Sequence, residues 1–378
     1  MDKKIRVGIF AVAIMVILSG CAQTNIDQSK KENLKIGVVA PLTGEMATWG
    51  ESVRGGAEIA VDEINSTGGV NGQKIDLIFE DNFACDKTAS VNAINKLIKM
   101  NNSKINLMTC SGAVLATAPI TEQAKTIMMV PGGSTAAIAE AGDYVFRTTI
   151  SDDIQAKNLS KFIADSMKIK RIAIIYVNND YGVGFFNNLS TEISTNGGQI
   201  VKSEKYSPED TEFRTQLTNI KNTSPDALII ICYGKEGGTI AKQARELGIR
   251  VQLIGTDNFG TNEVATAGGQ AVDGAIFSTE GIDMEQPRTK HLIDAYTQKY
   301  NHVPPVDYVV ADTYDAIRLL ADAISARGYN PDGIKDYLYG VKDYAGASGV
   351  ITMNSNGDAF KPTQIRQIRN GKLVNYQN

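Results

Sequence analysis

The chain has 378 residues, of which 43% are hydrophobic and 7% aromatic, and its formal net charge is -4. This is the composition of a globular protein, and the length favours two domains because single hydrophobic cores rarely grow this large. The sequence pI of about 5.5 provides no basic surface, so we expect no nucleic-acid partner.

The first residues predict an export signal. A basic start precedes the apolar run Val7–Leu18, which is shorter than the roughly 20 residues needed to span a membrane. The run leads into Leu-Ser-Gly-Cys, ending at Cys21, which resembles the cleavage box of bacterial lipoproteins. The resemblance implies a signal peptide over residues 1–20, lipidation of Cys21 and a tether over residues 21–33. The alternative is an uncleaved anchor in which the cysteine stands by chance. We therefore expect a lipid-anchored, extracytoplasmic protein.

Export places the other cysteines in an oxidising compartment. Cys85 follows the predicted strand Ile75–Glu80, and Cys110 follows the predicted strand Ile105–Thr109. Adjacent strand ends can bring two Cα atoms within bridging distance, so we predict a disulfide between Cys85 and Cys110. Cys232 remains as a buried thiol, and no Cys or His spacing indicates a metal site.

A strand, a loop and a helix open the folded part. The run Ile36–Ala40 is apolar throughout, which indicates a strand buried on both faces, as in parallel sheets. An apolar stripe from Ala57 to Ile64 follows at helical spacing. Trp49, the only tryptophan, lies in the loop just before the predicted helix, where ligands of open α/β sheets gather. It is either a pocket wall or a residue packed on the helix.

Strands and helices then alternate in two series, which predicts an α/β protein with two Rossmann-like lobes. The first series continues with Ile75–Glu80, a helix capped by Asp86, Ile105–Thr109, Val114–Lys125 and Ile127–Val130. The second comprises Ile154–Met167, Arg171–Val177, Phe185–Ser194, Gln199–Ser203, Phe213–Lys221, Ala227–Ile231, Gly237–Leu247, Val251–Ile254 and Ala275–Thr279. The helices Thr289–Tyr300 and Tyr308–Arg327 continue neither series, so we expect a return to the first lobe. The expected lobes are 34–148 with about 280–352, and 149–279 with about 353–378.

The residues that follow the strands divide by chemistry. Those of the first series are small or carry hydroxyls, and include Ser111, Gly132, Gly133 and Ser134. Those of the second are aromatic or acidic, and include Tyr181, Tyr233 and Asp257. Hydroxyls and helix N-terminal N–H groups bind carboxylates, and a buried carboxylate needs a cation. An α-amino acid has a carboxylate for the hydroxyls of the first series and an ammonium group for the acidic residue of the second. Trp49, Tyr181 and Tyr233 would then contact its side chain.

These residues also have structural interpretations, since serine caps helices, aspartate forms Asx-turns and tyrosine packs in cores.

The sequence motifs that would indicate an enzyme are weaker than these signs of a binding site. Gly182-Val183-Gly184 has Asn187 where a dinucleotide fingerprint needs its third glycine, and no Walker loop or Gly-x-Ser-x-Gly elbow occurs. The two histidines, His291 and His302, lie in or beside a polar helix. We expect neither enzymatic activity nor a cofactor.

Four stretches resemble a known family. IGVVAPLTG, WGESVRGGAEIAVDEIN, DNFACD and RIAIIYVNNDYGVG are similar in order and spacing to type I periplasmic solute-binding proteins, in the leucine/isoleucine/valine-binding branch of ABC importers. The resemblance runs from about Lys35 to the C-terminus. It implies the ligand-binding residues Trp49, Ser111, Gly132, Ser134, Tyr181, Tyr233 and, more loosely, Tyr308. The branch has glutamate at the acidic position, whereas this chain has Asp257, whose shorter side chain either draws the ligand deeper or leaves room for a different one.

The resemblance implies a monomeric protein that captures an amino acid, branched-chain or similar, and delivers it to an ABC permease. Two alternatives stay open. One is a sensor whose closed form signals to a membrane receptor, and the other is a binder of another small organic molecule, such as an amide or an aromatic acid.

Overall fold

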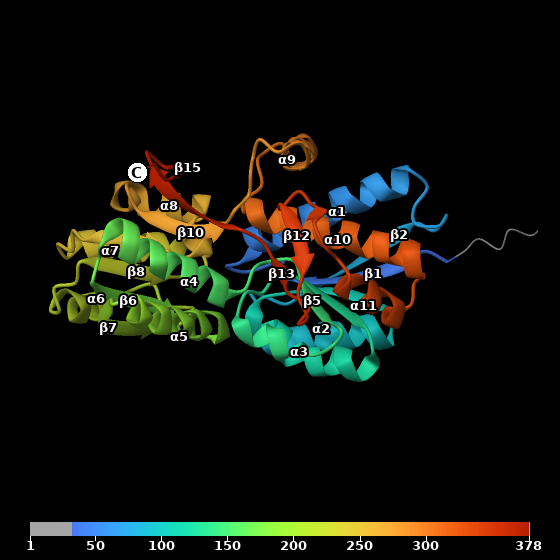
Figure 1. Cartoon of the computed structure of the whole chain (residues 1–378), viewed down its shortest axis with the longest axis horizontal. Coiled ribbons are helices and arrows are strands. Elements are labelled where there is room, and N and C mark those ends of the chain that lie inside the picture. The colour runs from blue at the N-terminus through green and yellow to red at the C-terminus, as the bar shows by residue number, and fades with distance from the viewer. Residues whose placement is uncertain (1–31, 378) are drawn as a thin grey trace, which may run out of the picture. The chain divides into compact units, whose positions relative to one another are not determined.

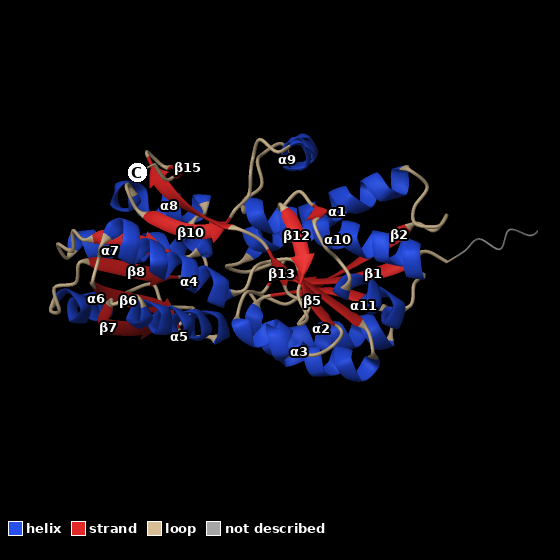
Figure 2. Cartoon of the chain, in the orientation of Figure 1, coloured by secondary structure: helices blue, strands red, loops and turns tan. Residues whose placement is uncertain are grey.

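Two sheets flanked by helices form the folded part of the chain (Figures 1 and 2). The structure is a computed structural model that describes residues 32–377. The predicted signal peptide, Cys21 and most of the predicted tether lie outside the described residues. Among the described helices, none combines the length and apolarity that crossing a membrane requires. The α/β architecture agrees with the prediction from sequence.

The first lobe contains five parallel strands in the spatial order β2-β1-β3-β4-β5. Their bounds are β1 Leu34–Ala40, β2 Ile75–Asp81, β3 Ile105–Thr109, β4 Ile127–Gly132 and β5 Val145–Arg147. The helices are α1 Ala47–Ser66, α2 Lys87–Lys99, α3 Ser111–Ala124, the 3-10 turn η1 Ala136–Glu140, α9 Pro287–Tyr300, α10 Asp307–Arg327 and α11 Pro331–Tyr339. β3 and β4 are buried along their whole length, which explains why apolar residues predominate in them. α10 packs on α1 and β4, so the chain returns to this lobe after leaving it.

The second lobe contains seven strands in the order β15-β14-β10-β9-β8-β6-β7. Their bounds are β6 Arg171–Val177, β7 Gln199–Tyr206, β8 Ala227–Ile231, β9 Gln252–Gly255, β10 Ile276–Glu280, β14 Thr363–Arg369 and β15 Lys372–Asn375. The helical segments are α4 Asp152–Phe162, the π-helical turn η2 Ile163–Met167, α5 Asp180–Thr195, α6 Arg214–Lys221, α7 Lys235–Glu246, η3 Asp257–Phe259, α8 Asn262–Gly268 and η4 Gly269–Val272. β14 runs antiparallel to β10 and β15, whereas the strands from β10 to β7 are parallel.

Several helices begin earlier than the sequence predicts. Trp49 lies in the first turn of α1 and not in the loop before it, which corrects the prediction. α3, α4 and α5 begin at Ser111, Asp152 and Asp180. Glycine, serine and aspartate in these first turns interrupt the apolar period that marks a helix. The elements β5, α8 and α11 and the strands after residue 340 are too short or too polar to predict from sequence.

Three segments of the described chain connect the lobes, from β5 to α4, from β10 to α9, and from a small antiparallel sheet to β14. The small sheet consists of β11 Tyr344–Ala345, β12 Val350–Met353 and β13 Ala359–Phe360. Because β13 pairs with β12, the small sheet extends to Phe360, and the chain then enters β14 at Thr363.

Buried ion pairs connect these three segments. Nε and Nη2 of Arg147 donate to the two carboxylate oxygens of Asp358 at 2.7 and 2.8 Å. Lys361, also buried, pairs with Glu280 and with Asp312. Burial alone would lower the pKa of Lys361, but the carboxylates of Asp312 and Glu280 raise it above its ordinary value. Arg147 thus links the end of β5 to the small sheet, and Lys361 links the segment after that sheet to the end of β10 and to α10.

Candidate functional site

Residues that follow strands of both sheets line one cavity. The strand order reverses between β1 and β3 in the first sheet, and between β6 and β8 in the second. Ligands of doubly wound sheets bind at the carboxyl ends of the strands beside such reversals. The inner cavity is lined by Met46, Trp49, Cys110, Ser111, Gly132, Gly133, Ser134, Thr149, Tyr181, Tyr233, Asp257, Asn258 and Tyr308.

All the ligand-binding residues predicted from the sequence line this inner cavity. The structure therefore brings them together, while their role in binding stays a prediction. Met46, Thr149 and Asn258 join them without a sequence signal of their own. Gln155 of α4 donates to Asp257 and Asp152 lies near that carboxylate, although neither lines the cavity. The sequence did not single them out, because an acid and an amide before an apolar stripe look like an ordinary helix start.

The inner cavity opens into a larger outer cleft. Its own volume is about 20 Å³, which holds about one water molecule. The outer cleft has a volume of about 500 Å³ and shares Met46, Trp49, Cys110 and Tyr233 with the inner cavity. An amino acid therefore enters the inner cavity only if the lobes move apart.

The first lobe provides hydrogen-bond donors. α3 begins at Ser111, whose Oγ accepts a hydrogen bond from the backbone N–H of Thr135 at 3.2 Å. The hydroxyl proton of Ser111 thus remains available to donate. The first N–H groups of a helix have no partner within the helix, and its N-terminus favours negative charge. This side of the cavity can therefore bind a carboxylate.

Arg147 positions the loop that carries Ser134. Its Nη1 donates to the carbonyls of Ser134 and Thr135, both at 3.0 Å, and of Gly133 at 3.4 Å. The Arg147 side chain is completely buried. The loop after β4 is therefore held by a charged group from the segment that connects the lobes.

Trp49 both packs and faces the cavity. A Cβ atom on Gly132 would come within 2.3 Å of the Trp49 ring, so only glycine allows the indole to lie against the end of β4. The indole Nε1 is buried, and Trp49 interacts with the Tyr308 hydroxyl. Trp49 is therefore both a packed residue and part of the cavity wall, so the two interpretations from the sequence are compatible.

The second lobe provides an oriented carboxylate. Oδ1 of Asp257 accepts hydrogen bonds from the Tyr181 hydroxyl at 3.0 Å and from the Asn258 backbone N–H at 2.9 Å. Oδ2 accepts a longer bond from Gln155 Nε2 at 3.4 Å. Burial raises the pKa of Asp257, and these hydrogen bonds partly oppose the rise. A cation placed here would offset the burial of the charge.

Aromatic side chains surround the space between these two groups. The rings of Tyr181 and Tyr233 stack with their centroids 5.1 Å apart and an interplanar angle of 26°. Tyr308 reaches the cavity from α10 of the first lobe. These rings, with Trp49, can contact the apolar side chain of a ligand.

Contacts between the lobes close the rim of the cleft. Lys87 Nζ of α2 lies 2.6 Å from Asp180 Oδ2 of α5. The Thr48 hydroxyl of α1 donates to Glu263 Oε1 of α8 at 2.7 Å. All four residues line the outer cleft, so opening the cleft separates both pairs.

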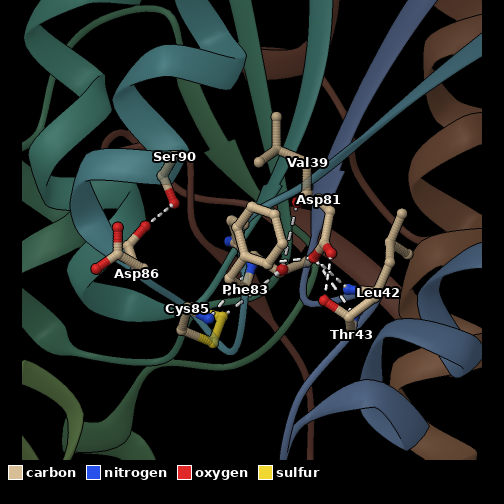
Figure 3. The surroundings of a disulfide bond; sticks show 11 residues. Val39, Leu42, Thr43, Asp81, Phe83, Cys85, Asp86 and Ser90 are labelled. Atoms are coloured by element: carbon tan, nitrogen blue, oxygen red, sulfur yellow. Dashed lines mark hydrogen bonds between the residues drawn. A yellow bond between two sulfur atoms is a disulfide. The ribbon is translucent and has the colours of Figure 1, made fainter.

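The disulfide between Cys85 and Cys110 forms as predicted, with the Cα atoms 5.8 Å apart. Figure 3 shows its surroundings, including Asp81, whose carboxylate accepts the Phe83 backbone N–H at 2.9 Å. Phe83, Ala84 and Cys85 have φ angles of 47°, 56° and 72°, a conformation that costs ordinary residues about 1 to 2 kcal/mol each. The disulfide joins this loop to Cys110 at the cavity.

The remaining cysteine and the histidines lie away from the cavity lining. Cys232 is a buried free thiol, as expected. The exposed His291 and His302 contact α1, with ring nitrogens 2.7 Å from Glu63 and 3.1 Å from Glu51. Within residues 32–377, no cluster of His, Cys, Asp or Glu could hold a metal ion.

Comparisons with known proteins agree with this architecture. The model of the periplasmic binding protein family matches residues 33–372. The Leu/Ile/Val-binding protein BraC3 of Rhizobium johnstonii is 29% identical over 346 residues, which cover 90% of this chain and 93% of that protein. The crystal structure of the leucine binding protein LivK from Thermotoga maritima has a TM-score of 0.84 and 28% identity, covering 91% of this chain and 98% of that one.

A further solved structure, LivJ from Streptococcus pneumoniae in complex with isoleucine, has a TM-score of 0.83 and 27% identity, and the match covers 90% of this chain and 97% of that one. These relatives are binding proteins by name, and they match nearly the whole described chain. The chain belongs to the type I periplasmic binding protein family, in the leucine/isoleucine/valine-binding branch.

Proposed function

We propose that this protein encloses an α-amino acid between its lobes. The observation that supports this most directly is the pairing of Ser111 and Ser134 with Asp257 in one small cavity. A zwitterion placed between them has its carboxylate beside hydroxyls and a helix N-terminus, and its ammonium group beside a carboxylate. Burial of either charge without such a partner would cost several kcal/mol.

The ligand is proposed to be a branched-chain amino acid or one of similar size. The names of the relatives, which include leucine and isoleucine, support this choice. Asp257, which is a methylene shorter than the glutamate of the branch, supports testing other side chains as well. Binding would stabilise the closed form by its higher affinity for that form, and the closed protein would deliver the ligand to an ABC permease.

We further propose that the protein is lipid-anchored through Cys21 on the outer side of the membrane. The Leu-Ser-Gly-Cys sequence supports this proposal. The variant Cys21→Ala is expected to lose lipid labelling and to leave the membrane fraction.

Lobe boundaries near residues 148, 280 and 361 are part of the proposal and are supported by the strand pairings on either side.

The binding test uses the purified protein without its first 20 residues. Calorimetry with L-leucine, L-isoleucine, L-valine, L-threonine and L-alanine should show binding of at least one, with a micromolar Kd, which corresponds to about -8 kcal/mol. Asp257→Ala should weaken binding sharply. The control Glu209→Ala removes an exposed carboxylate at the outer cleft and should leave affinity unchanged. Binding of benzoate but of no amino acid would contradict the proposal.

A further inference from the structure

A single residue connects strand β3 to helix α3. β3 ends at Thr109 and α3 begins at Ser111, so Cys110 makes the whole turn between them. Its φ and ψ angles are 70° and 121°, which lie outside the regions that residues with a side chain ordinarily occupy and are adopted readily only by glycine. Residues held in such conformations cluster at functional sites, where the surrounding structure imposes the strain.

This turn lies at the inner cavity. Cys110 and Ser111 both line the cavity, and the backbone N–H of Cys110 donates to the carbonyl of Gly132 at 2.7 Å. The Cys110 carbonyl accepts the N–H of Val114 at 3.0 Å and so begins the helical hydrogen bonds of α3. The two dihedral angles of Cys110 therefore set the direction in which α3 leaves the sheet, and with it the position of the Ser111 hydroxyl and of the first N–H groups of the helix.

The disulfide ties Cys110 to a loop that is itself fixed. The backbone N–H of Cys85 donates to Asn82 Oδ1 at 3.3 Å. Asn82 is fully buried, and its own N–H donates to the carbonyl of Ala40 at the end of β1, at 3.1 Å. Asp86, the residue after Cys85, caps the N-terminus of α2. The loop is therefore held by β1 and by α2 (Figure 3), and the disulfide transmits this anchoring to the turn after β3.

We propose that Cys110 is a positioning residue of the ligand site: its disulfide to Cys85 holds the turn in the conformation that aims Ser111 and the N-terminus of α3 at the ligand's carboxylate. This inference rests on the proposed amino-acid function. Without the covalent tether, a residue with a Cβ atom at position 110 relaxes to an ordinary φ, and binding must restore the strained angle. The disulfide therefore contributes to affinity as well as to stability, because it arranges the site before the ligand arrives.

The experiment compares two double variants that differ only in where a glycine stands. Cys85→Ala/Cys110→Gly and Cys85→Gly/Cys110→Ala both lack the disulfide and have the same composition. Glycine at position 110 adopts the observed angles without a tether, whereas alanine does not. Cys85 also has a positive φ, of 72°, but it lines the outer cleft and not the inner cavity. Glycine at position 85 thus relieves a strained residue that does not position Ser111.

Calorimetry with L-leucine, L-isoleucine, L-valine, L-threonine and L-alanine identifies the tightest ligand of the wild type, which is then used for the variants. Cys85→Ala/Cys110→Gly should stay within about twofold of the wild-type affinity, and Cys85→Gly/Cys110→Ala should bind at least about fivefold more weakly. Equal affinities of the two variants, or a larger loss with glycine at position 110, would overturn the inference. Thermal unfolding without ligand checks that both variants are folded at the temperature of the calorimetry.

Reduction of the wild type is a second measurement that requires no variant. Cys85 is partly exposed and lines the outer cleft, so a phosphine reductant can reach the disulfide from solvent. Trp49 is the only tryptophan and part of the cavity wall, so its fluorescence can report binding. The reduced protein should bind the same amino acid at least about fivefold more weakly and should regain its affinity on reoxidation. Unchanged affinity after complete reduction, verified by thiol titration, would overturn the inference.

Failure of the proposed function is visible in the oxidised wild type alone. If that protein binds none of the five amino acids, the proposed function fails and this inference fails with it. If it binds one of them and the two double variants bind that amino acid equally well, only this inference fails.

Discussion

Tyr308 and Asn258 join the two lobes inside the inner cavity. The Tyr308 hydroxyl donates to Asn258 Oδ1 at 2.8 Å, and both side chains are buried. Tyr308 lies in the first turn of α10, which packs on the first lobe, whereas Asn258 follows β9 of the second lobe. The bond can therefore exist only when the lobes are together, and it contributes to the closed form.

Tyr308→Phe should weaken ligand binding by about threefold to tenfold, because one buried hydrogen bond of the closed form is lost. Calorimetry with the tightest-binding amino acid measures the change. The control is Tyr314→Phe on the same helix, whose hydroxyl donates to Glu63 at 2.6 Å, away from the cavity. An equal loss of affinity in both variants would argue against a closing role for Tyr308.

Arg147→Lys should lower the free energy of unfolding by about 3 kcal/mol. Lysine retains the charge but cannot bind both oxygens of Asp358 and the carbonyls of the Ser134 loop at once. Urea unfolding measures the change. The control Arg171→Lys affects an exposed arginine that also donates to backbone carbonyls, and it should change stability by less than about 0.5 kcal/mol. Similar losses in both variants would contradict the positioning role of Arg147.

Replacing both Cys85 and Cys110 by alanine should lower the free energy of unfolding by about 3 to 4 kcal/mol, because the disulfide closes a loop between residues 25 apart in sequence. Thermal unfolding with and without a reductant is the measurement. The reductant should destabilise the wild type and leave the double variant unchanged. A reductant effect of the same size in both proteins would show that another group is responsible.

Asp152→Asn should stabilise the ligand-free protein more at pH 7 than at pH 4. Burial raises the pKa of Asp152 in the folded protein, so the folded state retains a proton that the unfolded state has lost above about pH 4. The free energy of unfolding of the wild type therefore falls as the pH rises. The asparagine variant has no carboxyl group to titrate here, so its free energy of unfolding should not show this decrease. Urea unfolding at three pH values measures the difference. A difference independent of pH would mean that Asp152 titrates normally.

The sequence predicts the fold because several central strands are buried. Runs such as Ile36–Ala40 and Ile127–Val130 contain no polar residue, which identifies parallel strands and therefore the edge at which a ligand binds. Ser111 and Asp257 could be named for the same reason, since each comes two residues after the end of a strand. Asp152 could not, because its importance depends on which lobe the first turn of α4 faces, and the sequence shows only an acidic helix start.

The ion pairs among the connecting segments have a mechanical consequence. Arg147 at the end of β5 holds the small sheet through Asp358, and Lys361, which follows that sheet, holds Glu280 at the end of β10. A motion that displaced one of these parts alone would separate buried charges, at a cost of about 3 to 5 kcal/mol. We therefore expect the three connections to bend together as a hinge whenever the lobes open or close.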